Sequence, residues 1–555
     1  MKKIKIINTT VACFIVLLMS CSEDFFETPP LAAETEASFY NSIDNLESAT
    51  VGCYSMLNAQ GFIDHGHIMI MGSIAADDME AGGKGPNDTP AIQEIDRLLH
   101  TSQNAYIPAF WGYAYKGVYF CNQFLKYMPG LNDGSLSDDE ASRLSIRTGE
   151  VKFLRALYYF YLTQTFGGVV LLESPVLLSE LESLKRATVK EMYELIERDL
   201  SEAIDLLPTK ANIDEVGRAN KEAAQALMAK MLLYESSYAK YKAGDERFGD
   251  VQIRWAEALS YAQEVIESPN LSLPGLNGET YNTFWSPTTD AYRFIFSVDG
   301  DNNSGGIFET QDVCLTGGNG WIRERGNSLT KWTSFREYPD ENGATQNWGW
   351  GWMAPAQKLR DIYEDGDPRI KTVFAAEGDS ALVTSGNWRP VDVNWSPTGY
   401  NLRKYEASPD QYWNPSEGEW NRGPVNERII RLADVYLWAA EAAFENNQTD
   451  VALEYLNTVR RRADMCDGTE DGVPAQLTSI TIDDIRNERR RELAGEGDRY
   501  SDIVRWNTAD EELSGLPILG GDMTLDFVAK KHDFFPIPQS EIDVLNGVVK
   551  QYEGW

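Results

Sequence analysis

Histidine and cysteine are scarce in this chain of 555 residues, which holds four histidines and six cysteines. Four of the cysteines stand far apart and outside the Cys-x-x-Cys spacing of zinc and redox sites: Cys53, Cys121, Cys314 and Cys466. We expect each of them to be a small, buried, apolar side chain. His65 and His67 offer two metal ligands, but no third ligand is evident, so we expect no metal and no other cofactor.

Positive charge is also in short supply. The chain has 50 lysines and arginines against 85 aspartates and glutamates, which gives a formal net charge of −35. Such a field repels phosphate backbones and excludes nucleic acid as a partner. It favours a neutral ligand over a strongly anionic polysaccharide.

Motifs for catalysis are missing as well. Lys84 lacks the spacing of a phosphate-binding loop, and no serine occupies a nucleophile elbow. The loop that starts at Asp299 departs from a calcium-binding loop at Ser304 and Thr310. A glycosidase needs two facing carboxylates, whereas adjacent residues such as Asp77 and Asp78 point to opposite faces of a strand. We therefore expect no catalytic residues, and a surface glycoside hydrolase is the less favoured alternative.

The N-terminus predicts export. Three lysines precede a short apolar core, Val11–Met19, which is too short to span a bilayer. The sequence Leu-Met-Ser-Cys that ends at Cys21 resembles the lipobox of bacterial lipoproteins, in which this cysteine is acylated. We predict a signal peptide at residues 1–20, lipidation of Cys21, a tether at residues 21–35, and membrane contact through the lipid alone. The alternative is an ordinary cleaved signal peptide that happens to end near a cysteine.

Ser22, Glu23 and Asp24 follow that cysteine at once. Acidic residues in this place resemble the surface-export signal of Bacteroidetes lipoproteins, so we expect a surface-exposed domain at the outer membrane. Acidic tethers are also simply soluble, which is the other interpretation of these residues.

Helical periodicity dominates both ends of the chain. Apolar residues recur every three or four positions through residues 36–269 and again through residues 426–555. Thr188 and Glu191 have capping-box spacing, and Pro129 with Gly130 is expected to stop an earlier helix. Pairs of helices of about this size are typical of tetratricopeptide-like (TPR-like) repeats, so we predict a TPR-like helical scaffold.

The middle of the chain, residues 270–425, has a different texture. Helical periodicity fades, glycine, proline and asparagine increase, and Phe294–Val298 is the one run that predicts a strand. Long irregular segments inside compact proteins are usually functional. We interpret residues 270–425 as a large, loop-rich insert that carries the binding site.

Tryptophan is concentrated in this insert, where nine of the fifteen tryptophans fall between Trp321 and Trp420. Flat aromatic rings bind the apolar face of a sugar ring, while polar side chains take its hydroxyls. If residues 348–352 are extended, three tryptophans share one face, with glycines that allow close approach of the backbone. The candidate ligand contacts in the insert are Trp321, Trp332, Trp348, Trp350 and Trp352. The alternative is that these tryptophans fasten long loops to the scaffold.

Several blocks resemble the SusD/RagB family of Bacteroidetes outer-membrane nutrient-binding lipoproteins. They occur in family order: Gly149–Leu171 (GEVKFLRALYYFYLTQTFGGVVL), Ala223–Tyr234, Arg431–Arg462, Ile485–Trp506 and Phe535–Ile542. The resemblance covers essentially the whole chain. The residues of these blocks are expected to pack helices, with Glu488 and Glu492 in ion pairs with nearby arginines.

The resemblance implies an all-α fold, in which about four TPR-like helix pairs support an irregular binding subdomain. It implies a function as well. Family members capture oligosaccharides, or in some cases peptides, and pass them to a SusC-like TonB-dependent transporter without hydrolysing them. Ligand contacts in such proteins come from the variable insert and from a segment after the first helices. Here these regions are Trp321–Trp352 and the neighbourhood of Asp77 and Asp78. The expected ligand is a neutral oligosaccharide, with a peptide or another nutrient as the alternative.

Overall fold

The structure is a computed structural model of the chain. It describes residues 39–40, 42–131, 134–283, 290–312, 326–339, 342, 345–347, 349–384, 387–406, 423–519, 522–545 and 547–555. The predicted signal peptide, Cys21 and the tether lie outside the described residues, as do Cys314, Trp321 and Trp348.

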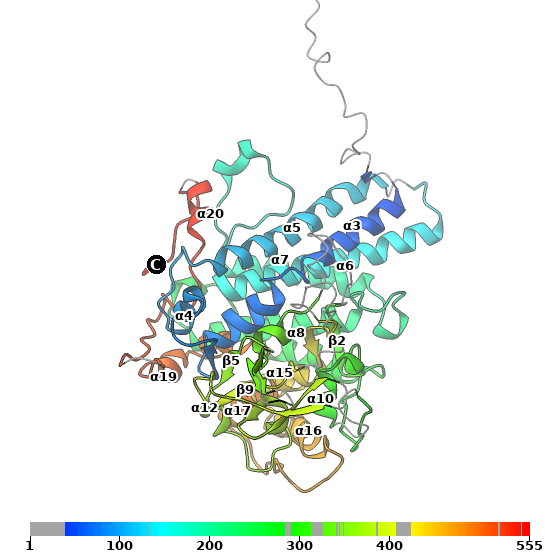
Figure 1. Cartoon of the computed structure of the whole chain (residues 1–555). Helices are drawn as coiled ribbons and strands as arrows, with labels where there is room; N and C mark the ends of the chain where they lie inside the picture. Colours follow the sequence, from blue (N-terminus) through cyan, green and yellow to red (C-terminus); the bar gives the residue numbers. More distant parts are fainter. Residues whose placement is uncertain are drawn as a thin grey trace, which may run out of the picture.

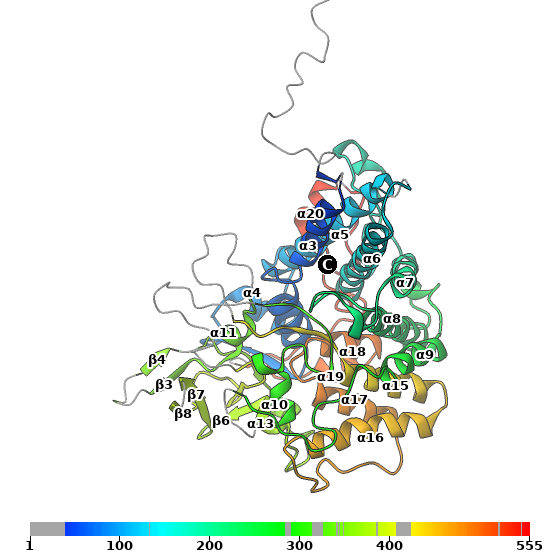
Figure 2. The ribbon, with the colours of Figure 1, turned by 90° about the vertical axis from the view of Figure 1, so that its right-hand side faces the viewer.

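Long helices form a continuous series, which Figure 2 shows along one side of the molecule. The series consists of α3 (Ile43–Ser55), α5 (Tyr106–Leu131), α6 (Asp138–Phe166), α7 (Val189–Leu206), α8 (Lys221–Tyr241), α9 (Trp255–Ile266), α15 (Leu432–Glu445), α16 (Thr449–Met465) and α17 (Ile482–Glu492). From α5 to α16, each helix packs against the next in the series, including α9 against α15 across the intervening segment. The predicted all-α, TPR-like scaffold is confirmed.

Local sequence signals explain where these helices begin. The Thr188 hydroxyl accepts from the backbone N–H of Glu191, whose carboxylate accepts from the N–H of Thr188. Ser137 and Glu140 form a second capping box at the start of α6, and Asn220 caps α8. Each cap satisfies N–H groups that a helix start otherwise leaves unpaired.

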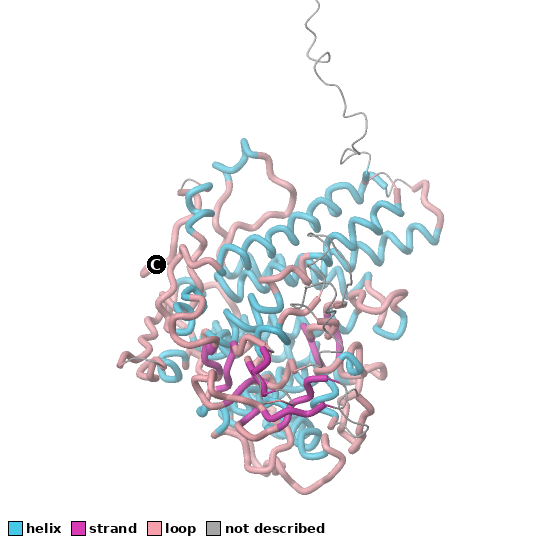
Figure 3. Tube along the Cα trace, in the orientation of Figure 1, coloured by secondary structure: helices cyan, strands magenta, loops and turns pink. Residues whose placement is uncertain are grey.

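The segment between α9 and α15 is irregular, as predicted, and Figure 3 shows the strands gathered in one part of the molecule. Its strands are β2 (Gly306–Glu309), β3 (Glu337–Pro339), β4 (Thr345–Asn347), β5 (Trp352–Pro355), β6 (Phe374–Ala376), β7 (Ser380–Thr384), β8 (Asn387–Pro390), β9 (Tyr400–Leu402) and β10 (Arg428–Arg431). They form antiparallel pairs β10–β2, β3–β4, β6–β9 and β7–β8, while β5 pairs with β1 (Met79–Gly82) from the N-terminal part.

Shorter helices connect these parts (Figure 1). They are the π-helix η2 (Ile63–Ile74) and α4 (Pro90–Asp96), α10 (Ala291–Ile295), α11 (Leu329–Thr333), α12 (Gln357–Arg360), α13 (Ile370–Val373), α18 (Arg499–Arg505), α19 (Ala509–Leu513) and α20 (Gln539–Val544). Among the described residues, no helix is both long enough and apolar enough to cross a membrane.

Two local predictions were wrong. The run Phe294–Val298 begins inside helix α10, because Asp290 caps that helix by accepting from the N–H of Arg293. Helix α5 does not stop at Pro129 but ends at Leu131. A proline in the last turn removes a single N–H donor, which the end of a helix tolerates better than its middle does.

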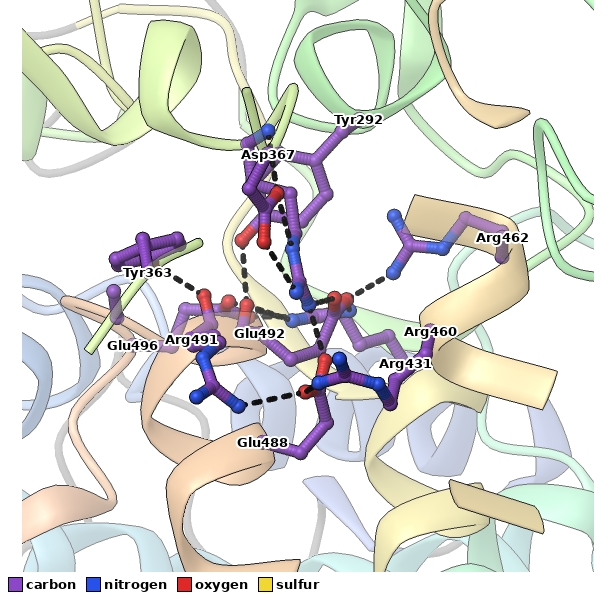
Figure 4. Close-up of polar contacts among 12 residues, drawn as sticks. Tyr292, Tyr363, Asp367, Arg431, Arg460, Arg462, Glu488, Arg491, Glu492 and Glu496 are labelled. Carbon is purple, nitrogen blue, oxygen red and sulfur yellow. Dashed lines mark hydrogen bonds and ion pairs between the residues drawn. The ribbon is translucent and has the colours of Figure 1, made fainter. Parts of the chain in front are cut away.

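A buried ion cluster joins the C-terminal helices of the scaffold to the insert (Figure 4). Glu488 pairs with Arg369 at 2.7 Å, Arg460 at 2.8 Å and Arg491 at 3.1 Å. Glu492, one turn later on α17, pairs with Arg369, Arg431 and Arg462. Burial works to raise the pKa of Glu488, but the arginine charges outweigh it and lower the pKa to about 2. Glu488 and Glu492 form ion pairs, as predicted, but most of their partners lie far away in the sequence and Arg491 is the partner from the same block.

Candidate functional site

Three tryptophans and one histidine form an aromatic cluster where the insert meets the N-terminal part. Trp332 lies on α11, Trp350 follows in a loop, Trp352 starts β5, and His65 belongs to η2. The His65 ring stacks on Trp332 with centroids 5.0 Å apart and planes at 19°. Trp350 meets Trp332 edge to face at 4.7 Å, and Trp352 lies 6.2 Å from Trp332. The structure therefore brings three of the predicted tryptophans together.

The members of the aromatic cluster differ in exposure. Trp332 is 9% exposed and Trp352 is 3% exposed, whereas Trp350 is only half-buried. The first two fasten the insert to the scaffold, which was the alternative interpretation of the tryptophans. Trp350 is the least buried of the three tryptophans and packs edge to face on Trp332.

The glycines around Trp350 allow this arrangement. The backbone N–H groups of Gly349, Trp350 and Gly351 donate to the carbonyls of Phe335, Lys331 and Ser334. A Cβ at Gly349 would lie 2.2 Å from the Ser334 carbonyl oxygen, so only glycine fits there. Gly351 has a φ of +68°, which interrupts the side-chain alternation of an extended strand. An extended run would have placed Trp350 and Trp352 on one face of a single strand. The structure does not have this arrangement.

A buried carboxylate fixes the base of the aromatic cluster. Asp64 lies 3.5 Å from Nδ1 of His65 and accepts from the hydroxyl of Ser328 and from the N–H of Gly61. Burial works to raise the pKa of Asp64, but the charge of His65 and these hydrogen bonds outweigh it and lower the pKa to about 2. The charged carboxylate thereby connects η2 to the start of α11.

Polar side chains lie beside Trp350. The Arg336 guanidinium donates to the Trp350 carbonyl oxygen at 2.5 Å and lies 3.8 Å from the Asp88 carboxylate. Tyr106 lies edge to face with His65 at 6.0 Å, and burial followed by the charge of Asp88 raises the pKa of its phenol. The aromatic cluster thus has an arginine, a carboxylate and a phenol at its edge, a combination that suits a ligand with an apolar face and several hydroxyls.

The predicted residues Asp77 and Asp78 directly precede β1, which pairs with β5 so that Gly82 lies opposite Trp352. The structure thus brings both predicted segments together. The two carboxylates themselves are buried. Asp77 pairs with Arg499 at 2.7 Å, with Lys358 at 2.7 Å and with Arg490 at 3.2 Å, and Asp78 pairs with Arg490 at 2.5 Å.

Burial works to raise the pKa of Asp77, but the charges of Arg499, Arg490 and Lys358 outweigh it and hold the pKa well below its usual range. A ligand would have to displace these cations to reach either carboxylate. We therefore propose that Asp77 and Asp78 position β1 beneath the aromatic cluster instead of contacting the ligand.

Comparisons with known proteins identify the family. Residues 307–555 match the model of the SusD family, and residues 74–233 match a model described as "Starch-binding associating with outer membrane". The chain belongs to the SusD/RagB family. The predicted recognition is confirmed by matches at both ends of the chain.

Curated relatives in the SusD family support the assignment over most of the chain. A SusD-like protein of Bacteroides ovatus is 26% identical over 91% of this chain and 82% of its own length. The starch-binding protein SusD of Bacteroides thetaiotaomicron is 25% identical over 84% of this chain and 81% of its own length. A solved laminarin-binding SusD-like protein is 26% identical and covers 92% of this chain and 99% of its own, with a TM-score of 0.71.

Four residues of this candidate site carry no sequence signal for ligand binding: His65, Asp88, Tyr106 and Arg336. His65 was considered as a metal ligand, but its ring stacks on Trp332, and no group of three or more metal-ligating side chains occurs among the described residues. No sequence signal links His65 to Trp332, because 266 residues separate them. Only the packing of α11 against η2 brings the two rings together.

One pH-dependent prediction arises beside Asp64. Glu427 is buried, and its Oε1 atom has no hydrogen-bond partner within the part of the chain that the structure describes. Burial, followed by the carboxylates of Asp312 and Asp64, raises the pKa of Glu427 well above its usual range. The folded protein therefore binds this proton more tightly than the unfolded chain does. The contribution of this group to the free energy of unfolding is fully present below about pH 4.5 and falls as the pH rises above that value.

Glu427→Gln is expected to remove this loss. The difference in urea midpoint between variant and wild type should grow in favour of the variant from pH 5 to pH 8. Within this pH range, each pH unit should add about 1.4 kcal/mol to the difference in free energy of unfolding between variant and wild type. Urea unfolding at both pH values measures it, and an equal difference at pH 5 and pH 8 would contradict a protonated Glu427.

Proposed function

We propose that this chain is a cell-surface lipoprotein that binds an oligosaccharide at the aromatic cluster and delivers it to a SusC-like TonB-dependent transporter. The observation that carries the proposal is the half-buried Trp350, which packs edge to face on Trp332, while Trp332 also meets His65 and Trp352. A sugar ring placed on this indole would bury its apolar face. In this proposal, Arg336, Asp88 and Tyr106 form hydrogen bonds with hydroxyl groups of the sugar.

Named relatives support the same class of ligand. The relatives include a protein named as starch-binding and a structure named as laminarin-binding, each aligned over more than four fifths of this chain. The net charge of −35 favours a neutral glycan. Trp321 and Trp348, outside the described residues, stay predicted contacts of the same insert.

Binding without catalysis is part of the proposal. Asp77 and Asp78, which the sequence analysis set aside as an acid/base pair, are held in ion pairs with three cations, and this leaves neither group free to transfer a proton to a sugar. Delivery to a transporter rests on membership in the family. The proposal of delivery is supported by one matching family model, whose description names association with the outer membrane.

A glycan panel tests the proposed function. The purified chain from residue 22 onward is incubated with neutral and acidic oligosaccharides and with peptides, while calorimetry reports binding and chromatography reports products. We expect at least one neutral oligosaccharide to bind and to remain intact. Release of shorter sugars would show a hydrolase, and binding of peptides alone would show a peptide carrier.

The lipid anchor is tested separately. Cys21→Ala should prevent incorporation of a clickable fatty acid and release the protein from the membrane fraction, because the acyl chains are the proposed attachment. Labelling is read from gels of the expressing bacterium. Continued labelling of the Cys21→Ala protein would disprove this assignment.

A further inference from the structure

Two buried cysteines that are far apart in the sequence meet between helices α3 and α5. Cys53 lies near the end of α3, Cys121 lies in the second half of α5, and both are 0% exposed. The two helices pack side by side (Figure 1). Both cysteines are free thiols in the structure, and Cys121 is the hydrogen-bonding neighbour of the Cys53 thiol.

The surrounding packing holds this pair in place. Tyr158 of α6 is buried and donates from its hydroxyl to the Cys53 carbonyl oxygen at 2.6 Å. Gly117 lies one turn before Cys121, and a Cβ there would lie 2.4 Å from the Tyr158 ring. The glycine therefore lets α5 approach α6 closely, and Tyr158 in turn fixes α3 against both helices.

We propose that Cys53 and Cys121 form a disulfide bond in the exported protein and cross-link α3 to α5. In this step both S–H bonds break, one S–S bond forms, and two protons and two electrons leave. The electrons reduce a disulfide of the export compartment, in a thiol–disulfide oxidoreductase or a small disulfide, to two thiols. Disulfides persist in exported proteins, so the proposal rests on the export that forms part of the proposed function.

The bond is best made while the chain folds. Burial, followed by the neighbouring Cys121, raises the pKa of the Cys53 thiol well above its usual range. The thiolate is the attacking species, so the buried pair reacts slowly once α3 and α5 have packed. For the same reason, a bond formed earlier is shielded from reduction in the folded protein.

The proposed bond encloses the scaffold side of the binding site. The segment between Cys53 and Cys121 contains η2, β1 and α4, and with them His65, Asp88 and Tyr106. Closing this loop restricts the unfolded chain and thereby stabilises the folded arrangement of these residues. The bond would thus stabilise the part of the site that belongs to the scaffold and packs against the insert.

Differential alkylation of the exported full-length protein tests the proposal. The protein is denatured with one alkylating reagent, reduced, treated with a second reagent and mapped by peptide mass spectrometry. We expect Cys53 and Cys121 to carry only the second reagent. Cys466 is equally buried, but the groups that act on its thiol include no described cysteine, so it should carry the first reagent and serves as the matched control.

Thermal unfolding provides a second readout. Reductant should lower the unfolding midpoint of the wild type and of Cys466→Ala by at least ~2 °C, and should leave Cys121→Ala unchanged. First-reagent label on Cys53 and Cys121 of the exported wild type would overturn the proposal, as would pairing of either residue with another cysteine.

Refolding the same protein in a mixture of reduced and oxidised glutathione separates two causes of failure. If glutathione joins Cys53 to Cys121 but the exported protein lacks the bond, the export route of the proposed function has failed, and the proposal for the exported protein is overturned with it. If the bond is absent under both conditions, the pairing itself is wrong. Neither result depends on whether a glycan binds.

Discussion

Trp350→Ala is expected to weaken oligosaccharide binding by about 10–100-fold, which corresponds to about 1.4–2.8 kcal/mol. The indole is half-buried and packs edge to face on Trp332. Its removal takes away the exposed aromatic surface, while Trp332, Trp352 and His65 remain in place. Calorimetric titration with the glycan selected from the panel measures the effect. The midpoint of thermal unfolding, recorded beside it, should fall less than in Trp352→Ala.

Two tryptophans serve as controls for this prediction. Trp352 is 3% exposed, and its replacement by alanine should cost about 3–5 kcal/mol of folding free energy, as for other buried aromatic residues. Trp395 is 40% exposed and lies in the insert after β8, outside the aromatic cluster, so Trp395→Ala should leave affinity unchanged. Equal affinity of Trp350→Ala and Trp395→Ala would place the glycan elsewhere.

Arg369→Met is expected to lower the free energy of unfolding by about 3–5 kcal/mol. Arg369 is 0% exposed and pairs with Asp367 at 2.8 Å, with Glu488 at 2.7 Å and with Glu492 at 3.1 Å. Methionine fills much of the volume but supplies no charge, so three buried carboxylates lose a shared cation. Urea unfolding followed by circular dichroism measures the change.

The matched control is a pair on the surface. Arg198 pairs with Glu173, and the two side chains are 49% and 51% exposed, so Arg198→Met should change stability by no more than about 1 kcal/mol. The account of the buried ion cluster would be contradicted if the two substitutions had effects of similar size.

The scaffold was predictable because its signals are local. Helical periodicity and the capping pair Thr188 and Glu191 determine where α7 starts, and the structure confirms that start. The ion pairs of Glu488 and Glu492 followed from the family resemblance of their block. The strand predicted for Phe294–Val298 failed because the cap at Asp290, four residues earlier, decides the conformation of that run.

The candidate site was only partly predictable because its contacts are distant in sequence. Tryptophan density identified the insert, and the prediction placed Asp77 and Asp78 near it. Nothing local shows that both carboxylates turn toward Arg490 and Arg499, more than 400 residues away. For the same reason, the sequence did not predict that Cys53 and Cys121 are neighbours, because this depends on how α3 and α5 pack.

The most direct test of the account is a crystal structure of the chain with the oligosaccharide that binds in the panel. The account predicts a sugar ring stacked on the exposed face of Trp350, with hydroxyls near Arg336, Asp88 or Tyr106 and with Asp77 and Asp78 still paired to their arginines. A sugar bound away from the aromatic cluster, with Trp350 uncovered, would contradict it.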